Sequence, residues 1–84
     1  MAPEFFAWHD FVGYAGVGLI VIAYFALQTG RMKGEAIGFS AMNAVGAALI
    51  LVSLTQTFNA ASFVIEIFWL AISLIGLARA FSRR

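Results

Sequence analysis

The stretch FVIEIFWLAISLIGL, residues 63–77, decides the fold class, because only Glu66, Ser73 and Gly76 interrupt its run of apolar side chains. Polar and apolar residues do not alternate along it, as they would in a half-buried strand. An open sheet is also excluded from lipid, because its edges leave backbone groups without hydrogen bonds. The stretch therefore predicts an α-helix that lies in lipid rather than in water.

The rest of the chain has the same character. Uncharged runs cover residues 11–30 and 36–65, and a helix needs about 20 apolar residues to cross a bilayer. Of the 84 residues, 63% are hydrophobic and 11% are charged, whereas soluble proteins average roughly 45–50% and 25%. A soluble domain of this size buries only about 60% of the surface that its unfolded chain exposes, which is too little to hide so many apolar groups.

We therefore predict an all-α integral membrane domain that fills residues 1–84 and forms a bundle of three transmembrane helices. The predicted helices span about residues 11–28, 36–57 and 60–81. The segment TGRMKGE, residues 29–35, separates the first two helices with two glycines and three charges. The segment TFNAAS, residues 57–62, separates the second from the third, and Asn59 or Ser62 is expected to cap the third helix.

The basic residues predict the orientation of the chain. Arg31 and Lys33 lie in the first loop, and the other three cations lie within residues 79–84, so three spans place all five on one side. The positive-inside rule assigns that side to the cytoplasm. We therefore expect the C-terminus inside and the N-terminus outside, with an aromatic belt at the outer interface formed by Phe5, Phe6, Trp8, Phe11 and Tyr14.

Composition argues against several classes of function. The chain has no cysteine and a single histidine, so no metal site is expected. A net charge of +1 offers little to a nucleic-acid partner. The first ten residues carry two acids and no basic region, so no signal peptide is expected. No pattern of nucleophile and base is present, so we expect neither an enzyme nor a cofactor.

Helical spacing divides each predicted helix into a packing face and a lipid face. Residues three and four positions apart are neighbours on a helix, and small residues let membrane helices approach one another closely. On the third helix this spacing gives one stripe of Ser62, Glu66, Trp69, Ser73 and Gly76. The residues expected to pack helices together are Gly13, Gly16, Gly46, Ala47 and Gly76. By depth, the polar side chains form an outer layer of Tyr14, Ser53 and Glu66 and an inner layer of Tyr24, Asn43 and Ser73.

Glu66 is the most informative of these residues. A carboxylate inside a bilayer costs about 2.5–3.5 kcal/mol on insertion scales, and no lysine or arginine lies near its depth. We expect Glu66 to be often protonated and to donate to Tyr14, Ser53 or a backbone carbonyl. Two roles fit this arrangement: a neutral acid that fixes helix packing, or a carboxyl that binds substrate or moves protons.

Four features of the sequence resemble the SemiSWEETs, the bacterial half-transporters of the PQ-loop class. They are Gly13 and Tyr14, the sequence FALQ at residues 25–28, Gly46, and Glu66 at the place of the substrate-binding asparagine. The sequence IEIFW, residues 65–69, more closely resembles a group of short, uncharacterised three-helix bacterial membrane proteins. The resemblance implies a multi-pass protein of the bacterial inner membrane whose three-helix protomers form an oligomer around a solute path.

Three positions differ from the SemiSWEET pattern. Leu27 replaces the proline of the Pro-Gln pair, and Ile50 replaces the tryptophan that closes over the sugar. With the acid at position 66, the resemblance implies a polar or cationic solute, or a proton, in place of a sugar. The candidate substrate-binding residues are Glu66, Trp69, Asn43, Tyr14, Tyr24 and Ser73.

Two functions remain open at this point. The first is a small-solute transporter that acts as an oligomer, with proton coupling through Glu66. The second is a non-catalytic accessory subunit that stabilises a larger membrane complex and meets a cation from its partner at Glu66. Both functions place the chain in a lipid bilayer and give it protein partners.

Overall fold

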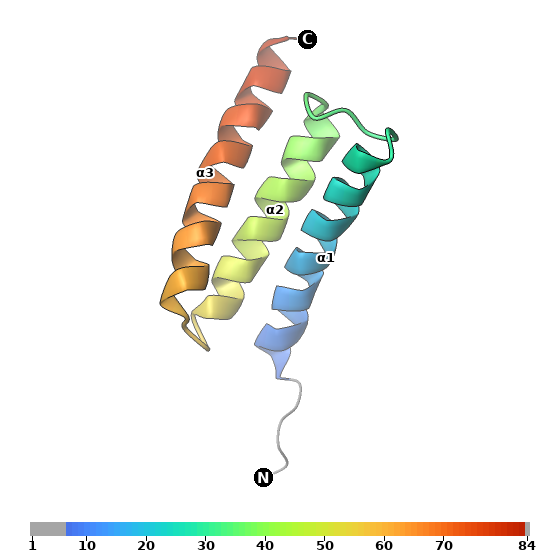
Figure 1. Ribbon diagram of the computed structural model, residues 1–84. Helices are drawn as coiled ribbons and strands as arrows, with labels where there is room; N and C mark the ends of the chain where they lie inside the picture. Colours follow the sequence, from blue (N-terminus) through green and yellow to red (C-terminus); the bar gives the residue numbers. More distant parts are fainter. Residues whose placement is uncertain (1–6, 84) are drawn as a thin grey trace.

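A computed structural model describes residues 7–83 of the chain. This part of the chain forms three helices, α1 (Trp8–Gln28), α2 (Ile37–Leu54) and α3 (Ala60–Ser82). The three run side by side and alternate in direction, so that the α1–α2 loop and the end of α3 lie at the same end (Figure 1). The structure is thus all-α over the described residues, as the sequence predicts.

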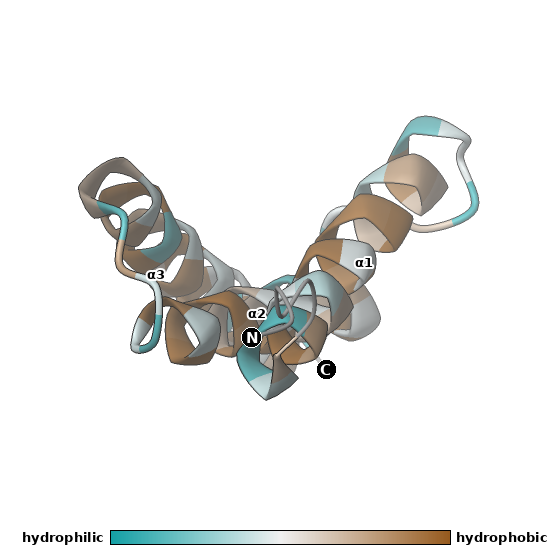
Figure 2. Ribbon diagram, turned by 90° about the horizontal axis from the view of Figure 1, so that it is seen from below, coloured by the Kyte–Doolittle hydropathy of each residue, from teal (hydrophilic) through white to brown (hydrophobic). Residues whose placement is uncertain are grey.

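Helix α2 lies in the middle of the row. Both α1 and α3 pack against α2, whereas within residues 7–83 α1 and α3 do not pack against each other. Viewed along the helices, α1 and α3 diverge from α2 like the arms of a V (Figure 2). One chain therefore forms an open layer in which α2 alone contacts both other helices.

The first and third helices begin where capping groups allow. Helix α1 starts at Trp8, three residues earlier than predicted, because Asp10 Oδ2 accepts the backbone N–H of Ala7 at 2.9 Å. Asn59 caps α3, and its Oδ1 accepts the backbone N–H of Ser62 at 2.9 Å. Of the two predicted caps, Asn59 is the one used.

Helix α2 is shorter than predicted and ends at Leu54 rather than at residue 57. The backbone N–H groups of Thr55 and Gln56 donate to Val52 and Ser53, each 3.1 Å away. These bonds reach back three residues instead of four, which tightens the chain and ends the α-helix. The Thr55 hydroxyl also donates to the Val52 carbonyl at 2.7 Å.

All three helices are long and apolar enough to cross a membrane. They contain 21, 18 and 23 residues, or about 27–34 Å at a rise of roughly 1.5 Å per residue. Large apolar side chains such as Phe68, Ile72 and Ile75 are exposed. Side chains of this kind are suited to contact with lipid. The length of the helices and their exposed apolar surface support the three-helix membrane-protein class predicted from the sequence.

The buried residues are small, apart from Asn43. In a bilayer the hydrophobic effect does not drive helices together, so they associate through close van der Waals contact and hydrogen bonds. Small side chains permit that contact because they let two backbones approach. The buried positions in the described part of the chain are Gly16, Ala23, Ser40, Asn43, Ala44, Gly46, Ala47, Ser73 and Ala80.

Helices α1 and α2 approach each other closely at Gly16 and Gly46. A Cβ added to Gly16 would lie 2.5 Å from the carbonyl oxygen of Gly46, and one added to Gly46 would lie 2.7 Å from that of Gly16. The obstruction in each case is backbone, which a side-chain rotation cannot relieve. Near the start of α1, Gly13 is similarly close to Ser53, whose Oγ would lie 2.8 Å from an added Cβ.

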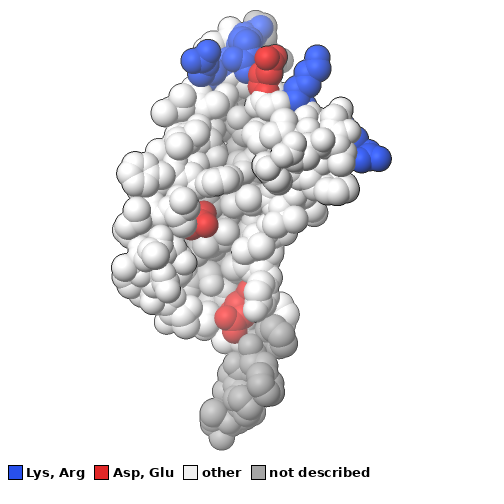
Figure 3. All heavy atoms as spheres, viewed as in Figure 1, with Lys and Arg blue, Asp and Glu red and all other residues white. Residues whose placement is uncertain are grey.

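The charges of the described residues are unevenly distributed along the molecule. Figure 3 shows the lysines and arginines gathered at one end; they are Arg31, Lys33, Arg79 and Arg83. The predicted clustering of these four cations is therefore confirmed, and Arg84 lies outside the described residues. Of the predicted aromatic belt, Trp8, Phe11 and Tyr14 are exposed on α1, and Phe5 and Phe6 lie outside the described residues.

Replacing either Gly16 or Gly46 by alanine should weaken the packing of α1 against α2. We expect the free energy of unfolding to fall by about 1–3 kcal/mol, the usual cost of overpacking. Unfolding in mixed micelles titrated with sodium dodecyl sulfate, followed by circular dichroism, measures this loss.

Gly18→Ala is the matched control, because no atom beyond the neighbouring residues and backbone of its own helix lies within 4 Å of a Cβ added at that position. It should leave stability unchanged or raise it slightly through the higher helix propensity of alanine. Equal losses for Gly18→Ala and Gly16→Ala would show that the backbone contact is not the cause.

Candidate functional site

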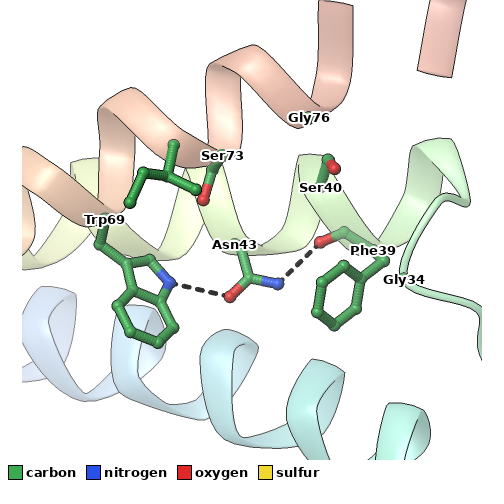
Figure 4. A pocket seen from close by; sticks show the side chains of 8 residues that line it. Gly34, Phe39, Ser40, Asn43, Trp69, Ser73 and Gly76 are labelled. Carbon is green, nitrogen blue, oxygen red and sulfur yellow. Dashed lines mark hydrogen bonds between the residues drawn. The ribbon is translucent and has the colours of Figure 1, made fainter. Parts of the chain in front are cut away.

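A cavity of about 290 Å³ lies between α2 and α3 on the side of the α1–α2 loop. Figure 4 shows its lining from close by. The lining residues are Gly34, Phe39, Ser40, Asn43, Trp69, Ile72, Ser73 and Gly76. The walls are mostly apolar and carry a few polar groups, which is the usual composition of a small-molecule site.

A hydrogen bond between Asn43 and Trp69 forms one wall of the cavity. The indole Nε1–H of Trp69 donates to Asn43 Oδ1 at 2.9 Å, and Asn43 Nδ2 donates to the Phe39 carbonyl at 2.8 Å (Figure 4). Asn43 is only 5% exposed, so both of its amide atoms need partners. These two bonds hold the amide in one orientation and join α2 to α3.

Two serine hydroxyls add polar groups to the lining. Ser40 is 5% exposed and Ser73 is 8% exposed, and no hydrogen bond joins either side chain to another described residue. Gly76 makes room for Ser40, since a Cβ added to Gly76 would lie 2.7 Å from Ser40 Oγ. A ligand in the cavity would therefore find two hydroxyls with free hydrogen-bonding capacity and one amide that retains a spare N–H.

Glu66 lies outside this cavity. It is one turn before Trp69 on the same face of α3 and is half-buried. Its Oε1 atom is buried and has no hydrogen-bond partner. The predicted bond from Glu66 to Tyr14, Ser53 or a carbonyl is therefore absent from the described residues. Tyr14 is out of reach because α1 and α3 lie on different sides of α2 and do not meet. Ser53 belongs to α2 but lines the hollow on the α1 side, with Gly13 and Tyr14.

The predicted polar layers form only in part. In the inner layer, Asn43 and Ser73 line the same cavity, but Tyr24 is exposed on α1 and its hydroxyl accepts from Gln28 Nε2 at 2.7 Å. In the outer layer, Tyr14 and Ser53 line a second hollow of about 210 Å³ with Gly13 and Asp10, and Glu66 is not part of it. Each layer thus joins two helices instead of three.

Of the candidate binding residues, the structure brings Asn43, Trp69 and Ser73 to one cavity and places Glu66, Tyr14 and Tyr24 elsewhere. Ser40 was not among the residues predicted to bind substrate. Ser40 lies three residues before Asn43, so a reading of the second helix at helical spacing places both on one face. Because no charged side chain lines the cavity, its chemistry suits a small ligand that is largely apolar and carries hydrogen-bonding groups.

Comparison with known proteins identifies a family. The model of an uncharacterised protein family matches residues 9–84, and the chain belongs to that family. No curated protein and no solved structure was found to match the chain.

A double-mutant cycle should detect the Asn43–Trp69 bond. We expect Asn43→Ala and Trp69→Phe to show a coupling free energy of about 0.6 kcal/mol and at most about 1.7 kcal/mol, as for other hydrogen bonds between membrane helices. The same micelle titration measures each stability.

Asn43→Ala combined with Trp8→Phe provides the control, because Trp8 lies at the start of α1 and is exposed. Those two changes should be additive. Additivity of Asn43→Ala with Trp69→Phe would instead show that the bond contributes nothing to stability.

Proposed function

We propose that this chain, as a member of that family, binds a small solute within the membrane and carries it across as an oligomer, in the manner of a SemiSWEET-like transporter. The observation that supports this proposal best is the cavity between α2 and α3. It combines apolar walls with the amide of Asn43 and the hydroxyls of Ser40 and Ser73. No catalytic role is proposed, because these groups include neither a general base nor an activated nucleophile.

The open arrangement of the helices favours an oligomer. Since α1 and α3 diverge on one side of α2 (Figure 2), one chain cannot enclose a path through the membrane. A second copy placed against the open side of α2 would close the path. A twofold dimer is the commonest way in which identical chains do this. The solute would then pass between two cavities of the same kind.

Glu66 supports a link to protons. It lies about one turn, or roughly 5 Å along the helix axis, from Trp69, and its Oε1 atom has no partner. Ionisable residues inside membranes commonly serve substrate binding or proton transfer. We propose that protonation of Glu66 accompanies solute movement past Trp69.

The setting that we propose is the bacterial inner membrane, crossed three times, with the N-terminus outside and the C-terminus in the cytoplasm. The cations at the end shared by the α1–α2 loop and α3 (Figure 3) support this orientation. Cytoplasmic ends of membrane helices carry an excess of lysine and arginine.

Flux through proteoliposomes tests the transport proposal. Vesicles containing the full chain should move at least one of three probes, namely glucose, methylamine or protons. For that probe, Ser73→Ala should lower the flux by about fivefold, since one neutral hydrogen bond is worth roughly 1 kcal/mol.

Ser62→Ala is the control, because Ser62 lies on the same helix and outside the cavity lining. It should transport like the unmodified chain. Absence of flux for all three probes would remove transport as the function.

The unpartnered oxygen of Glu66 favours a second candidate function. An accessory subunit of a larger membrane complex could receive a cationic side chain or a hydrogen-bond donor from its partner at this atom. The partner helix would then occupy the space between α1 and α3. In that case the chain acts by packing and not by moving a solute.

Glu66→Gln distinguishes the two candidates. The substitution keeps the shape of the side chain and removes its charge, so a neutral, protonated Glu66 predicts an assembly of unchanged mass and modestly lower stability. The mass of the detergent-purified native assembly gives the result. Loss of assembly would indicate that an ionised Glu66 pairs with a cation from a different protein.

A further inference from the structure

The end of α3 carries a hollow that neither candidate function uses. It has a volume of about 300 Å³ and is lined by Ala78, Arg79, Ser82 and Arg83. All four residues are exposed; the first three lie in the last two turns of α3, and Arg83 follows the helix directly. The hollow lies at the end of the molecule where the lysines and arginines gather (Figure 3).

Within residues 7–83 no acidic side chain neutralises the positive charge at this end. Among residues 7–83 the only side chains close enough for an ion pair are those of His9 and Asp10, near the start of α1. The one described acid near the basic end is Glu35, in the α1–α2 loop. Its backbone carbonyl, not its carboxylate, accepts from Arg83 at 2.9 Å. No described residue accepts a hydrogen bond from the Arg79 side chain, so its guanidinium donors are open to a ligand.

Arg83, which lines the hollow, donates to the backbone of Glu35. This bond ties the end of α3 to the α1–α2 loop, 48 residues away in sequence. It uses one nitrogen of a guanidinium that carries five N–H donors. The remaining donors of Arg83, together with those of Arg79, suit an oxyanion with several acceptor oxygens.

An apolar stripe runs along α3 to this hollow. Phe68, Ile72, Ile75 and Arg79 follow one another at steps of four, three and four, so they share one face of the helix. The three apolar members are 62%, 65% and 60% exposed. A ligand whose headgroup lies at Arg79 could therefore extend a hydrocarbon chain along α3.

We propose that the hollow at the end of α3 binds the phosphate of an anionic phospholipid, with one acyl chain along the Phe68–Ile72–Ile75 stripe. Arg79 and Arg83 contact the phosphate, and the helix end positions both at the level of the headgroups. The stripe distinguishes this ligand from inorganic phosphate, which has nothing to place against it. The net negative charge of an anionic phospholipid distinguishes this ligand from zwitterionic lipids, because each nearby lysine or arginine favours anionic headgroups.

Native mass spectrometry of the full chain in detergent, with phosphatidylglycerol or phosphatidylcholine added, tests the proposal. We expect bound phosphatidylglycerol at lipid concentrations that give little bound phosphatidylcholine. The double variant Arg79→Gln and Arg83→Gln should weaken phosphatidylglycerol binding by about fivefold or more for each arginine. Inorganic phosphate at millimolar concentration should not displace the lipid.

Arg31→Gln with Lys33→Gln is the matched control, since it removes the same charge from the same end but outside the hollow. It should weaken lipid binding several-fold less than the pair in α3. Equal losses for the two pairs would overturn the proposal and leave a diffuse electrostatic attraction. Displacement by inorganic phosphate, or equal binding of the two lipids, would overturn it as well.

Discussion

The close approach of α1 and α2 at Gly16 and Gly46 is the constraint on which the structure depends most. In lipid the apolar faces of helices gain nothing by leaving their solvent, so only close contact and hydrogen bonds hold helices together. At the α1–α2 contact, two glycines that face each other allow the close contact. At the α2–α3 contact, the indole of Trp69 donates a hydrogen bond to the amide of Asn43.

Because both contacts involve α2, this helix carries most of the buried residues and much of the polar chemistry. Ser40 and Asn43 face α3, and Gly46 faces α1. The large apolar residues are left on the outer faces, where lipid replaces water as their solvent. The cavity lies between α2 and α3, and its lining includes the small residues Gly76 and Ser73.

The charges are separated from this packing. The cations and Glu35 lie at one end and Asp10 near the other, so Glu66 is the one described charge-bearing group in the middle of a span. An isolated acid at that position is costly, and residues 7–83 offer its Oε1 atom no hydrogen-bond partner. A group from outside the chain, whether proton, solute or protein, is the natural complement. The same reasoning underlies the proposed anion site at Arg79 and Arg83, which form no ion pair with another described side chain.

The sequence by itself determined the lipid environment, the helical class, the two loops, the cap at Asn59 and the collection of cations at one end. Each of these follows from composition or from neighbours within a few residues. The early start of α1 and the early end of α2 depended on local hydrogen bonds of Asp10, Thr55 and Gln56 that hydropathy does not report. Only the tertiary structure decided that α2 lies between the other two helices. The periodicity of a helix shows which of its faces is polar but not which neighbour that face meets, so the partnership of Asn43 with Trp69, and the separation of Glu66 from Tyr14, came from the packing alone.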